Sequence, residues 1–354
     1  MEAEIQQQTD NRIFIEKQKE MKYLVTGASG FLGSNLIKNL VRSGNKVVGL
    51  TRKTSNLRRL EGVIPDIELR TASLSDYPGL LDALDGIDGV FHLAANVRIG
   101  SFKKKEIRRD NVAGCQNLFN AAIEKKISKV VYVSSISIFG SDIEEMLRET
   151  DVAAGRIMST YGETKLVSYY SFKNAYNRGL DITAVIPSNI FGPDDPNFGP
   201  LFKNYVQKHL KVIAGNLNAN MGMVHVDDVS KGMMLTMVKG KPGEAYILNS
   251  TNITLKELLA YAEQYTSIKA PSIKIPKSVI KSAAVISEIA GRIIRQNMIL
   301  NRQSAELLFT THPRFDSSKA KKELGWKPKS FDDAFKATLH WYLDKYGKKK
   351  AGTA

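Results

Sequence analysis

Residues 26–33 read Thr-Gly-Ala-Ser-Gly-Phe-Leu-Gly, between the β-branched run Tyr23–Thr26 and the helical stretch Phe31–Arg42. Gly27 permits a tight turn, Gly30 lets backbone N–H groups approach a pyrophosphate, and Gly33 allows the helix to pack closely on the strand. The N-terminus of a helix also favours negative charge. Because the glycines stand between a strand and an amphipathic helix, they predict a nucleotide-binding site and not an ordinary strand-to-helix turn.

The chain from Lys22 to Pro187 alternates short β-branched runs with longer helical stretches. This alternation predicts βαβ units in an α/β fold, and right-handed crossovers place helices on both faces of a doubly wound parallel sheet. The predicted strands are Tyr23–Thr26, Lys46–Leu50, Ile67–Thr71, Gly89–Leu93, Val130–Ser134 and Ile182–Ile186. The predicted helices are Phe31–Arg42, Gly79–Leu84, Ile107–Lys125 and Tyr161–Arg178.

Three regions follow from this pattern. Residues 1–20 are expected to form an N-terminal extension, residues 21–190 a nucleotide-binding domain, and residues 191–354 mostly a smaller substrate-binding domain interleaved with the first. The extension has no apolar core typical of a secretory signal, and no apolar run is long enough to span a bilayer. Cys115 is the only cysteine, which favours a reducing, cytoplasmic setting.

The 354 residues carry 51 Lys and Arg against 36 Asp and Glu, a net charge of +15. This charge predicts attraction to phosphates, nucleic acid or acidic membranes. No nucleic-acid readout motif accompanies it, so no specific nucleic-acid partner is expected. The five histidines are scattered without ligand spacing, and no metal site is expected.

Further motifs follow the glycine loop in order, and each matches a conserved stretch of one enzyme superfamily. They are His92-Leu93-Ala94-Ala95, Asn111-Val112-Ala113-Gly114, Val133–Gly140, Tyr161-Gly162-Glu163-Thr164-Lys165, Pro187–Pro193, Val224–Asp228, Asp316–Lys319 and Glu323–Trp326. With the glycine spacing G-x-x-G-x-x-G, the chain resembles the extended short-chain dehydrogenase/reductases, the NAD-dependent epimerase/dehydratase family. It is most similar to their dihydroflavonol reductase-like and hopanoid-associated sugar epimerase group. The resemblance implies a Rossmann sheet and NAD(P).

Tyr161 and Lys165 stand four residues apart on a predicted helix and therefore on one face. A nearby cation and a positive nicotinamide ring favour phenolate, so we expect the pKa of Tyr161 to fall from about 10 towards the working range. Tyr161 is then the predicted general acid/base. The resemblance implies that Lys165 also bonds the nicotinamide ribose, and that Ser135 orients the same substrate oxygen as Tyr161.

The end of the second predicted strand bears on the choice of cofactor. NAD-binding sites of this type have an acidic residue there for the ribose 2′-hydroxyl, whereas this chain has Arg52 and Lys53. A guanidinium suits a 2′-phosphate, which favours NADP over NAD, unless both cations are simply solvated. Ser73 replaces an Asp that faces the adenine in many members. The cofactor contacts implied by the resemblance are Gly27, Ser29, Gly30, Phe31, Leu32, Gly33, Arg52, Ser73, Leu74, Ala94, Tyr161, Lys165, Pro187 and Ile190.

Three absences favour a ketone reductase over a nucleotide-sugar enzyme. Asn220–Met223 and Ile186 stand where sugar-nucleotide enzymes often have Arg, and Ile136-Ser137 replaces the acidic residues of a dehydratase. The predicted function is an NADP-dependent oxidoreductase that interconverts a carbonyl and a secondary alcohol, with Ser135 and Asn189 facing the small-molecule substrate. A nucleotide-sugar epimerase/dehydratase and a non-catalytic cofactor-binding protein remain the alternatives.

Three basic segments are left over. The cluster Lys103, Lys104, Lys105, Arg108 and Arg109 begins a helix that in this family often forms a homodimer interface, although it is also typical of a solvated face. Lys277–Arg295 has the periodicity of an amphipathic helix. It fits a lid or packing helix, or a helix lying on an acidic membrane. The lysine-rich tail, Lys345–Lys350, carries no assignment.

Overall fold

The computed structural model describes residues 21–97, 104–294, 298 and 300–347. The predicted extension at residues 1–20, together with Lys103, Arg295 and the last part of the lysine-rich tail, lies outside the described residues.

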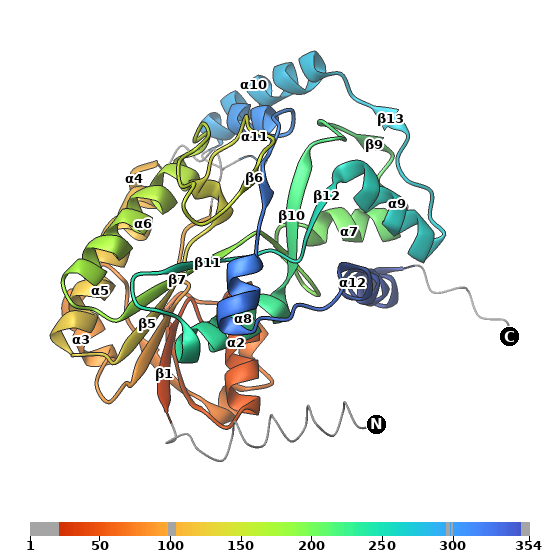
Figure 1. Cartoon of the computed structure of the whole chain (residues 1–354). Coiled ribbons are helices and arrows are strands. Elements are labelled where there is room, and N and C mark those ends of the chain that lie inside the picture. Colours follow the sequence, from red (N-terminus) through yellow and green to blue (C-terminus); the bar gives the residue numbers. More distant parts are fainter. Residues whose placement is uncertain (1–20, 98–103, 295–297, 299, 348–354) are drawn as a thin grey trace, which may run out of the picture.

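A seven-stranded parallel sheet forms the centre of the molecule (Figure 1). Its order is β11-β7-β5-β4-β1-β2-β3. The bounds are β1 Lys22–Thr26, β2 Lys46–Thr51, β3 Glu68–Thr71, β4 Gly89–His92, β5 Lys129–Val133, β7 Ile182–Pro187 and β11 Ala245–Leu248. The predicted α/β doubly wound fold is confirmed, and all six predicted strands are present. The seventh strand, β11, was not predicted, and it joins the sheet from beyond residue 190 by pairing with β7.

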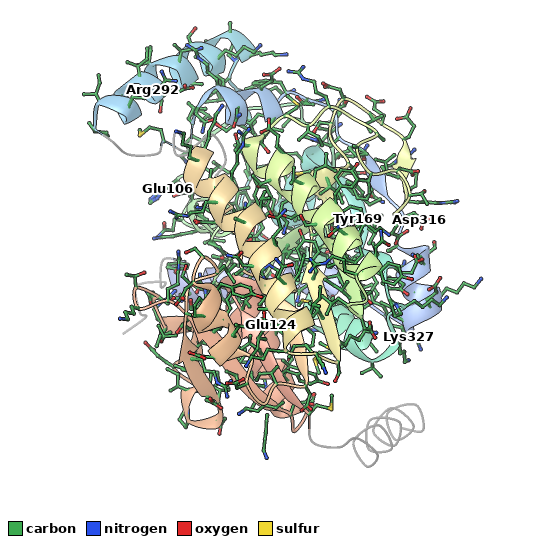
Figure 2. The ribbon with its side chains drawn as sticks, turned by 90° about the vertical axis from the view of Figure 1, so that its left-hand side faces the viewer. Glu106, Glu124, Tyr169, Arg292, Asp316 and Lys327 are labelled. Atoms are coloured by element: carbon green, nitrogen blue, oxygen red, sulfur yellow. The ribbon has the colours of Figure 1, made fainter. Side chains whose placement is uncertain are left out.

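Helices cover both faces of the sheet, and each face has its own apolar core. On one face α3 (Tyr77–Ala83), α5 (Gly114–Glu124) and α6 (Thr160–Asn177) bury Leu118 and Phe172 against the strands. Figure 2 views this face, with Glu124 on α5 and Tyr169 on α6. The other face is covered by α2 (Phe31–Arg42) and α8 (Val226–Lys239). Strands buried on both sides explain their continuous β-branched runs.

The strand order reverses between β1 and β4. The chain moves outward from β1 to β2 and β3, then returns to the other side of β1 to form β4 and β5. In open α/β sheets, ligands bind at the carboxyl ends of the strands that flank such a reversal. The topology therefore directs attention to the segments that follow Thr26 and His92, which are register partners.

The C-terminal part adds a second, smaller sheet. β8 (Asn189–Phe191) pairs in parallel with β10 (Asn220–His225), which pairs antiparallel with β12 (Thr251–Thr254). Three helices pack beside it around a separate apolar core that includes Phe202 and Phe335. They are α7 Gly199–Val206, α9 Leu255–Thr266 and α12 Phe331–Tyr346.

Short elements complete the fold. Two-residue strands pair as β9 with β13 and as β6 with β14. Their bounds are Val212–Ile213, Ile273–Lys274, Met146–Leu147 and Arg314–Phe315, in that order. The remaining helices are α4 Lys104–Arg108, α10 Lys277–Ile293, α11 Arg302–Leu307, the π-helices Arg109–Ala113 and Ala320–Leu324, and the 3₁₀ turns Arg58–Leu60, Ile64–Asp66 and Ile136–Ile138. Within the described ranges, no helix is both long and apolar enough to cross a lipid bilayer.

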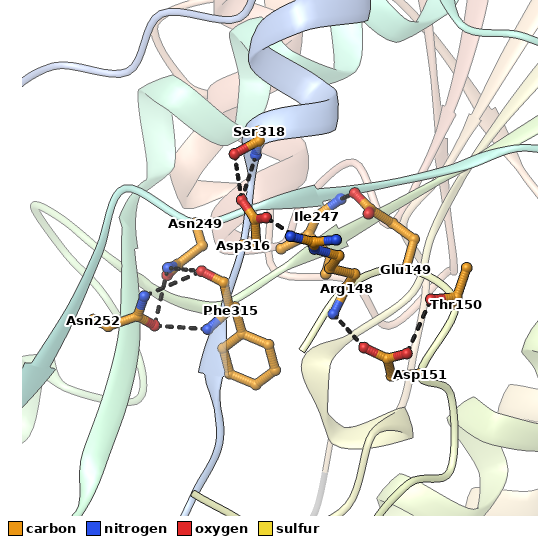
Figure 3. A network of polar contacts seen from close by, with 10 residues as sticks. All are labelled: Arg148, Glu149, Thr150, Asp151, Ile247, Asn249, Asn252, Phe315, Asp316 and Ser318. Carbon is orange, nitrogen blue, oxygen red and sulfur yellow. Dashed lines mark hydrogen bonds and ion pairs between the residues drawn. The ribbon is translucent and has the colours of Figure 1, made fainter. Parts of the chain in front are cut away.

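A polar network ties the C-terminal chain to the main sheet (Figure 3). Asn252 donates a hydrogen bond to the carbonyl oxygen of Phe315 at 3.1 Å, and Arg148 pairs with Asp316 at 3.2 Å. Next to Arg148, the Glu149 carboxylate accepts a hydrogen bond from a backbone N–H of β11 at 2.8 Å. The bonds of Arg148 and Glu149 hold the segment that precedes α6 against Asp316 and against β11.

Candidate active site

The glycine loop is closed too tightly for side chains at two positions. Gly27 has a φ of +70°, and a Cβ there would lie 3.0 Å from the backbone nitrogen of Ala94. A Cβ on Gly33 would lie only 2.1 Å from the carbonyl oxygen of Gly27. The first turn of α2 therefore packs directly on the loop, as the glycine spacing predicted.

The N-terminus of α2 is open to an anion. Gly30 is the N-cap residue, so no side chain accepts a hydrogen bond from the first turn, which also has no acidic residue. The first N–H groups of a helix have no partner within the helix, and their partial positive charge attracts a phosphate. The backbone at this point fits the pyrophosphate of a dinucleotide.

Hydrogen bonds brace the loop after β4 against β1. The Thr26 hydroxyl accepts bonds from the backbone N–H groups of Leu93 and Ala94, both at 3.1 Å, and lies 2.8 Å from Nδ1 of His92. Nε2 of His92 lies 3.0 Å from Sγ of Cys115. Burial lowers the pKa of His92 to about 3, so the ring is neutral. His92 is a structural bridge between two strand ends.

A cavity of about 530 Å³ lies along these strand ends. Seven of the predicted cofactor residues line it: Gly27, Ser29, Gly30, Arg52, Ser73, Leu74 and Ala94. Thr51, Ser55, Asn96 and Arg109 also line it, and sequence reasoning missed them because no motif marks them. Together with the glycine loop and the open N-terminus of α2, this cavity fits the adenosine and pyrophosphate part of a nicotinamide dinucleotide.

The other seven predicted cofactor residues do not line this cavity, and Tyr161 and Lys165 of α6 are among them. Gly33 packs on the loop, and Leu32 lies partly buried in the core beneath it. Phe31 lines a second, smaller cavity of about 330 Å³. Pro187 is buried at the end of β7, and Ile190 is partly buried in β8. Their contacts with a cofactor stay predictions.

The end of β2 carries a cation where many NAD sites carry a carboxylate. Arg52 is exposed and lines the cavity, and its backbone N–H donates to Oγ of Ser55 at 3.0 Å. The two carboxylates in the cavity lining, Glu106 and Asp110, come from α4 and the π-helix that follows it. The β2 end of the cavity is therefore positively charged.

Ser135 and Tyr161 are brought together from two elements. Ser135 follows β5 and caps a 3₁₀ turn, where its Oγ accepts a hydrogen bond from the Ser137 N–H at 3.2 Å. Tyr161 lies in the first turn of α6, which is capped by Ser159 through the Gly162 N–H at 3.0 Å. The Ser135 side chain lies close enough to the Tyr161 hydroxyl to lower its pKa.

Lys165 is only 4% exposed, one turn after Tyr161 on α6. Its Nζ donates to the carbonyl oxygen of Val133 at 2.6 Å and lies 4.9 Å from the centre of the Tyr132 ring. Burial lowers the pKa of Lys165 to about 8. The cation is held at the end of β5, next to the strand residues that lead to Ser135.

The expected lowering of the Tyr161 pKa, which relied in part on a bound nicotinamide ring, stays a prediction, and the chain's own residues act in the opposite direction. Burial raises this pKa to about 12, and the nearby Ser135 hydroxyl only partly opposes the rise. Lys165 does not offset it, because its ammonium is directed to the Val133 carbonyl and the Tyr132 ring. At neutral pH the Tyr161 hydroxyl is therefore protonated and can donate.

A buried amide links the cavity to α6. Asn111 donates to Oγ1 of Thr164 at 2.9 Å and to the carbonyl oxygen of Asn96 at 3.0 Å, and it accepts from the Asn96 N–H at 2.6 Å. It lies in the π-helix Arg109–Ala113, where sequence periodicity predicted ordinary α-helix. Single π turns often mark functional sites. Asn111 thus positions the start of α6, although the sequence motif suggested no role for it.

The predicted substrate residue Asn189 makes a structural bond. Its amide donates to the carbonyl oxygen of Gly222 at 2.9 Å and joins β8 to β10. A role towards substrate stays a prediction. Among the described residues no three His, Cys, Asp or Glu side chains group closely enough to hold a metal ion.

Comparison with known proteins agrees with this arrangement. Residues 23–248 match the NAD dependent epimerase/dehydratase family. The chain belongs to this family. It is an NAD(P)-dependent enzyme of the extended short-chain dehydrogenase/reductase type, and the reductases and dehydrogenases among its relatives support an oxidoreductase in general.

Family members resemble the chain over nearly its whole length. Sterol demethylase protein B of Methylococcus capsulatus is 30% identical over 92% of this chain and 99% of its own. A putative dihydroflavonol 4-reductase of Synechocystis is 27% identical over 90% and 94%. The dTDP-glucose 4,6-dehydratase DesIV of Streptomyces venezuelae, solved with NAD and TYD bound, shares the fold with a TM-score of 0.76 at 22% identity, covering 93% and 99% of the two chains.

Proposed function

We propose that this family member is an NADP-dependent oxidoreductase that interconverts a carbonyl and a secondary alcohol. The observation that carries the proposal is the grouping of Ser135 at the end of β5 with Tyr161 in the first turn of α6, and with Lys165 buried one turn further along α6 and bonded to the Val133 carbonyl. Two hydroxyl groups that lie close together can both reach a single substrate oxygen. This is the arrangement that proton transfer to a carbonyl requires.

In the reducing direction the Tyr161 hydroxyl donates its proton to the substrate oxygen, and in the oxidising direction the Tyr161 phenolate takes it back. Ser135 bonds the same oxygen and holds it in line. When bound, a nicotinamide cofactor would supply or accept the hydride. Lys165, whose pKa is about 8, is still mostly protonated at neutral pH, and its ammonium, held by the Val133 carbonyl, is proposed to bond the nicotinamide ribose.

The choice of NADP rests on Arg52. A guanidinium binds a phosphate with charge-assisted, often bidentate hydrogen bonds. Arg52 lines the cavity at the end of β2 and has no ion pair among the described residues. A ribose 2′-phosphate bound in the cavity would supply that partner.

The substrate is proposed to be less phosphorylated than a nucleotide sugar. Ile186, where sugar-nucleotide enzymes often have Arg, is fully buried inside β7. The segment Asn220–Met223, the other expected place for such an Arg, forms part of β10 and carries no cation. A carbonyl compound without a diphosphate suits this environment.

We also propose a homodimer in a reducing, cytoplasmic setting. On the outer face of α6, Val167 is 46% exposed and Tyr170 is 55% exposed, and the first turn of α6 meets the basic helix α4 where Glu163 pairs with Arg108 at 3.1 Å. Paired helices could cover these side chains. The single cysteine, Cys115, is buried and forms no disulfide.

The proposal is tested by replacing Tyr161 with Phe. Turnover should fall by about 10²-fold to 10⁴-fold because the proton donor is lost, whereas the affinity for NADPH, measured by fluorescence titration, should stay unchanged. The control is Tyr170→Phe, which removes an exposed hydroxyl from the same helix. Turnover of Y161F close to that of the unchanged enzyme would refute the role of Tyr161.

A further inference from the structure

Helix α10 is attached to the rest of the molecule along one side only. It runs along the edge of the molecule in Figure 1, and Figure 2 shows it from another side, marked by Arg292. Its buried residues Ile280 and Ala284 pack with Ala305 of α11 in a small separate cluster. The opposite side of the helix is exposed and has no partner among the residues that the structure describes.

The side that faces away from this cluster is apolar. Val279 is 53% exposed, Ile286 69%, Ile289 51% and Ile293 77%. With 3.6 residues per turn, positions 279, 286 and 293 fall in one line, and Ile289 lies beside it. The stripe is about 21 Å long at 1.5 Å per residue. A helix on the surface of a globular protein normally turns charged residues, not isoleucines, to water.

Charges lie at the flank of the stripe and are mainly positive. Helix α10 contains Lys277, Lys281 and Arg292 against a single carboxylate, Glu288. Glu288 is paired with Arg292 at 2.7 Å and lies 3.9 Å from Arg302 of α11. Its charge is therefore already neutralised, and the region stays positive, as does the whole chain at +15.

We propose that the outer face of α10 docks on an anionic lipid bilayer, with the helix lying in the plane of the interface. The isoleucine stripe enters the boundary between headgroups and acyl chains, and the flanking cations contact acidic headgroups. A second copy of the chain fits the face less well, because two such helices would bring cations against cations. This surface is independent of the proposed oxidoreductase chemistry.

The contacts of α11 show how the docked helix is joined to the active-site side. Glu306 of α11 pairs with Arg156 at 3.3 Å, and the hydroxyl of Thr310 lies 3.6 Å from the sulfur of Met158. Arg156 and Met158 belong to the segment that leads directly into Ser159, the cap of α6. The bilayer surface is thus connected through one short helix to the segment before Tyr161.

Vesicle sedimentation of the full chain tests the proposal. One set of vesicles contains phosphatidylcholine alone, and the other also contains phosphatidylglycerol. At low salt the unchanged protein should bind the anionic vesicles at least tenfold more tightly than the neutral ones, and high salt should weaken the binding. Absence of binding to anionic vesicles would overturn the proposal.

Two variants test whether vesicle binding depends on the apolar stripe of α10 or only on the positive charge of the chain. The double change Ile286→Glu with Ile293→Glu should reduce binding to anionic vesicles at least tenfold. Both side chains are exposed, so folding is preserved, which circular dichroism verifies. The matched control Val238→Glu alters an exposed apolar residue on α8 and should bind like the unchanged protein. Equal binding by the double variant would contradict docking through α10.

Light scattering tests the alternative that a second copy of the chain, and not a bilayer, covers the outer face of α10. If the Ile286→Glu, Ile293→Glu variant changes from a dimer to a monomer without vesicles present, a second copy covers the face and the bilayer proposal is wrong. An unchanged mass together with lost vesicle binding supports it.

Discussion

The first turn of α2 and the outer face of α10 are packed in opposite ways. At α2 a single added carbon on Gly33 would lie 2.1 Å from the Gly27 carbonyl oxygen. At α10 the Ile293 side chain is 77% exposed. The first surface is built from backbone held at close range and suits a small, rigid ligand. The second presents flexible apolar side chains and suits a broad, soft surface. Substitutions should therefore be costly at the first surface and harmless to folding at the second.

The largest effect is expected from Gly33→Ala. The new methyl group would meet backbone atoms that have no room to move, so the free energy of unfolding should fall by about 3 kcal/mol, at the upper end for overpacking, and cofactor binding should weaken. Urea unfolding measures the loss. The control is Gly62→Ala, because a Cβ at Gly62 meets nothing within 4 Å. Equal stability of the two variants would show that Gly33 does not pack closely on the carbonyl oxygen of Gly27.

Arg52→Glu should change the choice of cofactor. Loss of a charge-assisted hydrogen bond to the 2′-phosphate removes roughly 1.5–3 kcal/mol, so KM for NADPH should rise at least tenfold while KM for NADH stays the same or falls. Steady-state kinetics with both cofactors measures the ratio. Lys53→Glu is the matched control, since Lys53 is exposed but does not line the cavity. An unchanged ratio in R52E would leave the NADP proposal without support.

The smallest effect is a gain in stability from Lys165→Met, which should also abolish turnover. The pKa of Lys165 is about 8 in the folded chain against 10.5 for an ordinary lysine. Removing this buried charge should raise the free energy of unfolding by up to about 3 kcal/mol at neutral pH. Leaving the Val133 carbonyl without its hydrogen-bond donor should lower it by about 1–3 kcal/mol. We expect a net gain of about 1 kcal/mol in thermal or urea unfolding.

The lowered pKa of Lys165 also predicts how the stability of the folded chain changes with pH. Between about pH 8 and 10.5 the unfolded chain binds more protons at Lys165 than the folded chain does. The unchanged protein should therefore gain stability as pH rises through that range, and K165M should lack that part of the gain. The control Lys173→Met removes another lysine of α6 whose Nζ bonds a carbonyl, that of Gly243 at 2.7 Å. A variant K165M that is several kcal/mol less stable would contradict the cost of the buried cation.

Local signals in the sequence predicted the parts of the fold that depend on neighbouring residues. The glycine spacing predicted the glycine loop between β1 and α2, and the six β-branched runs predicted six strands. β11 was missed because its four residues enter the sheet about 60 residues after β7, and only tertiary pairing makes Ala245–Leu248 a strand. The π-helix at Asn111 was missed because its extra residue does not disturb helical periodicity enough to be seen.

In the candidate active site, too, local signals predicted the elements but not the contacts with distant residues. The motifs brought Ser135, Tyr161 and Lys165 to the correct elements, but the protonation state of Tyr161 depends on burial and on where the Lys165 ammonium points. That direction is set by the Val133 carbonyl and the Tyr132 ring, which are 28 or more residues away from Tyr161 in the sequence. Spacing along one helix carries no information about such distant partners.

The central claim is tested most directly by a cofactor-coupled absorbance screen with product analysis. NADPH and NADH are offered with ketones, aldehydes, sterols and nucleotide sugars. We predict that a ketone or aldehyde is reduced to its alcohol with one NADPH oxidised per product, and that NADPH is preferred. Conversion of a nucleotide sugar with no net change in cofactor would contradict it and identify an epimerase or dehydratase.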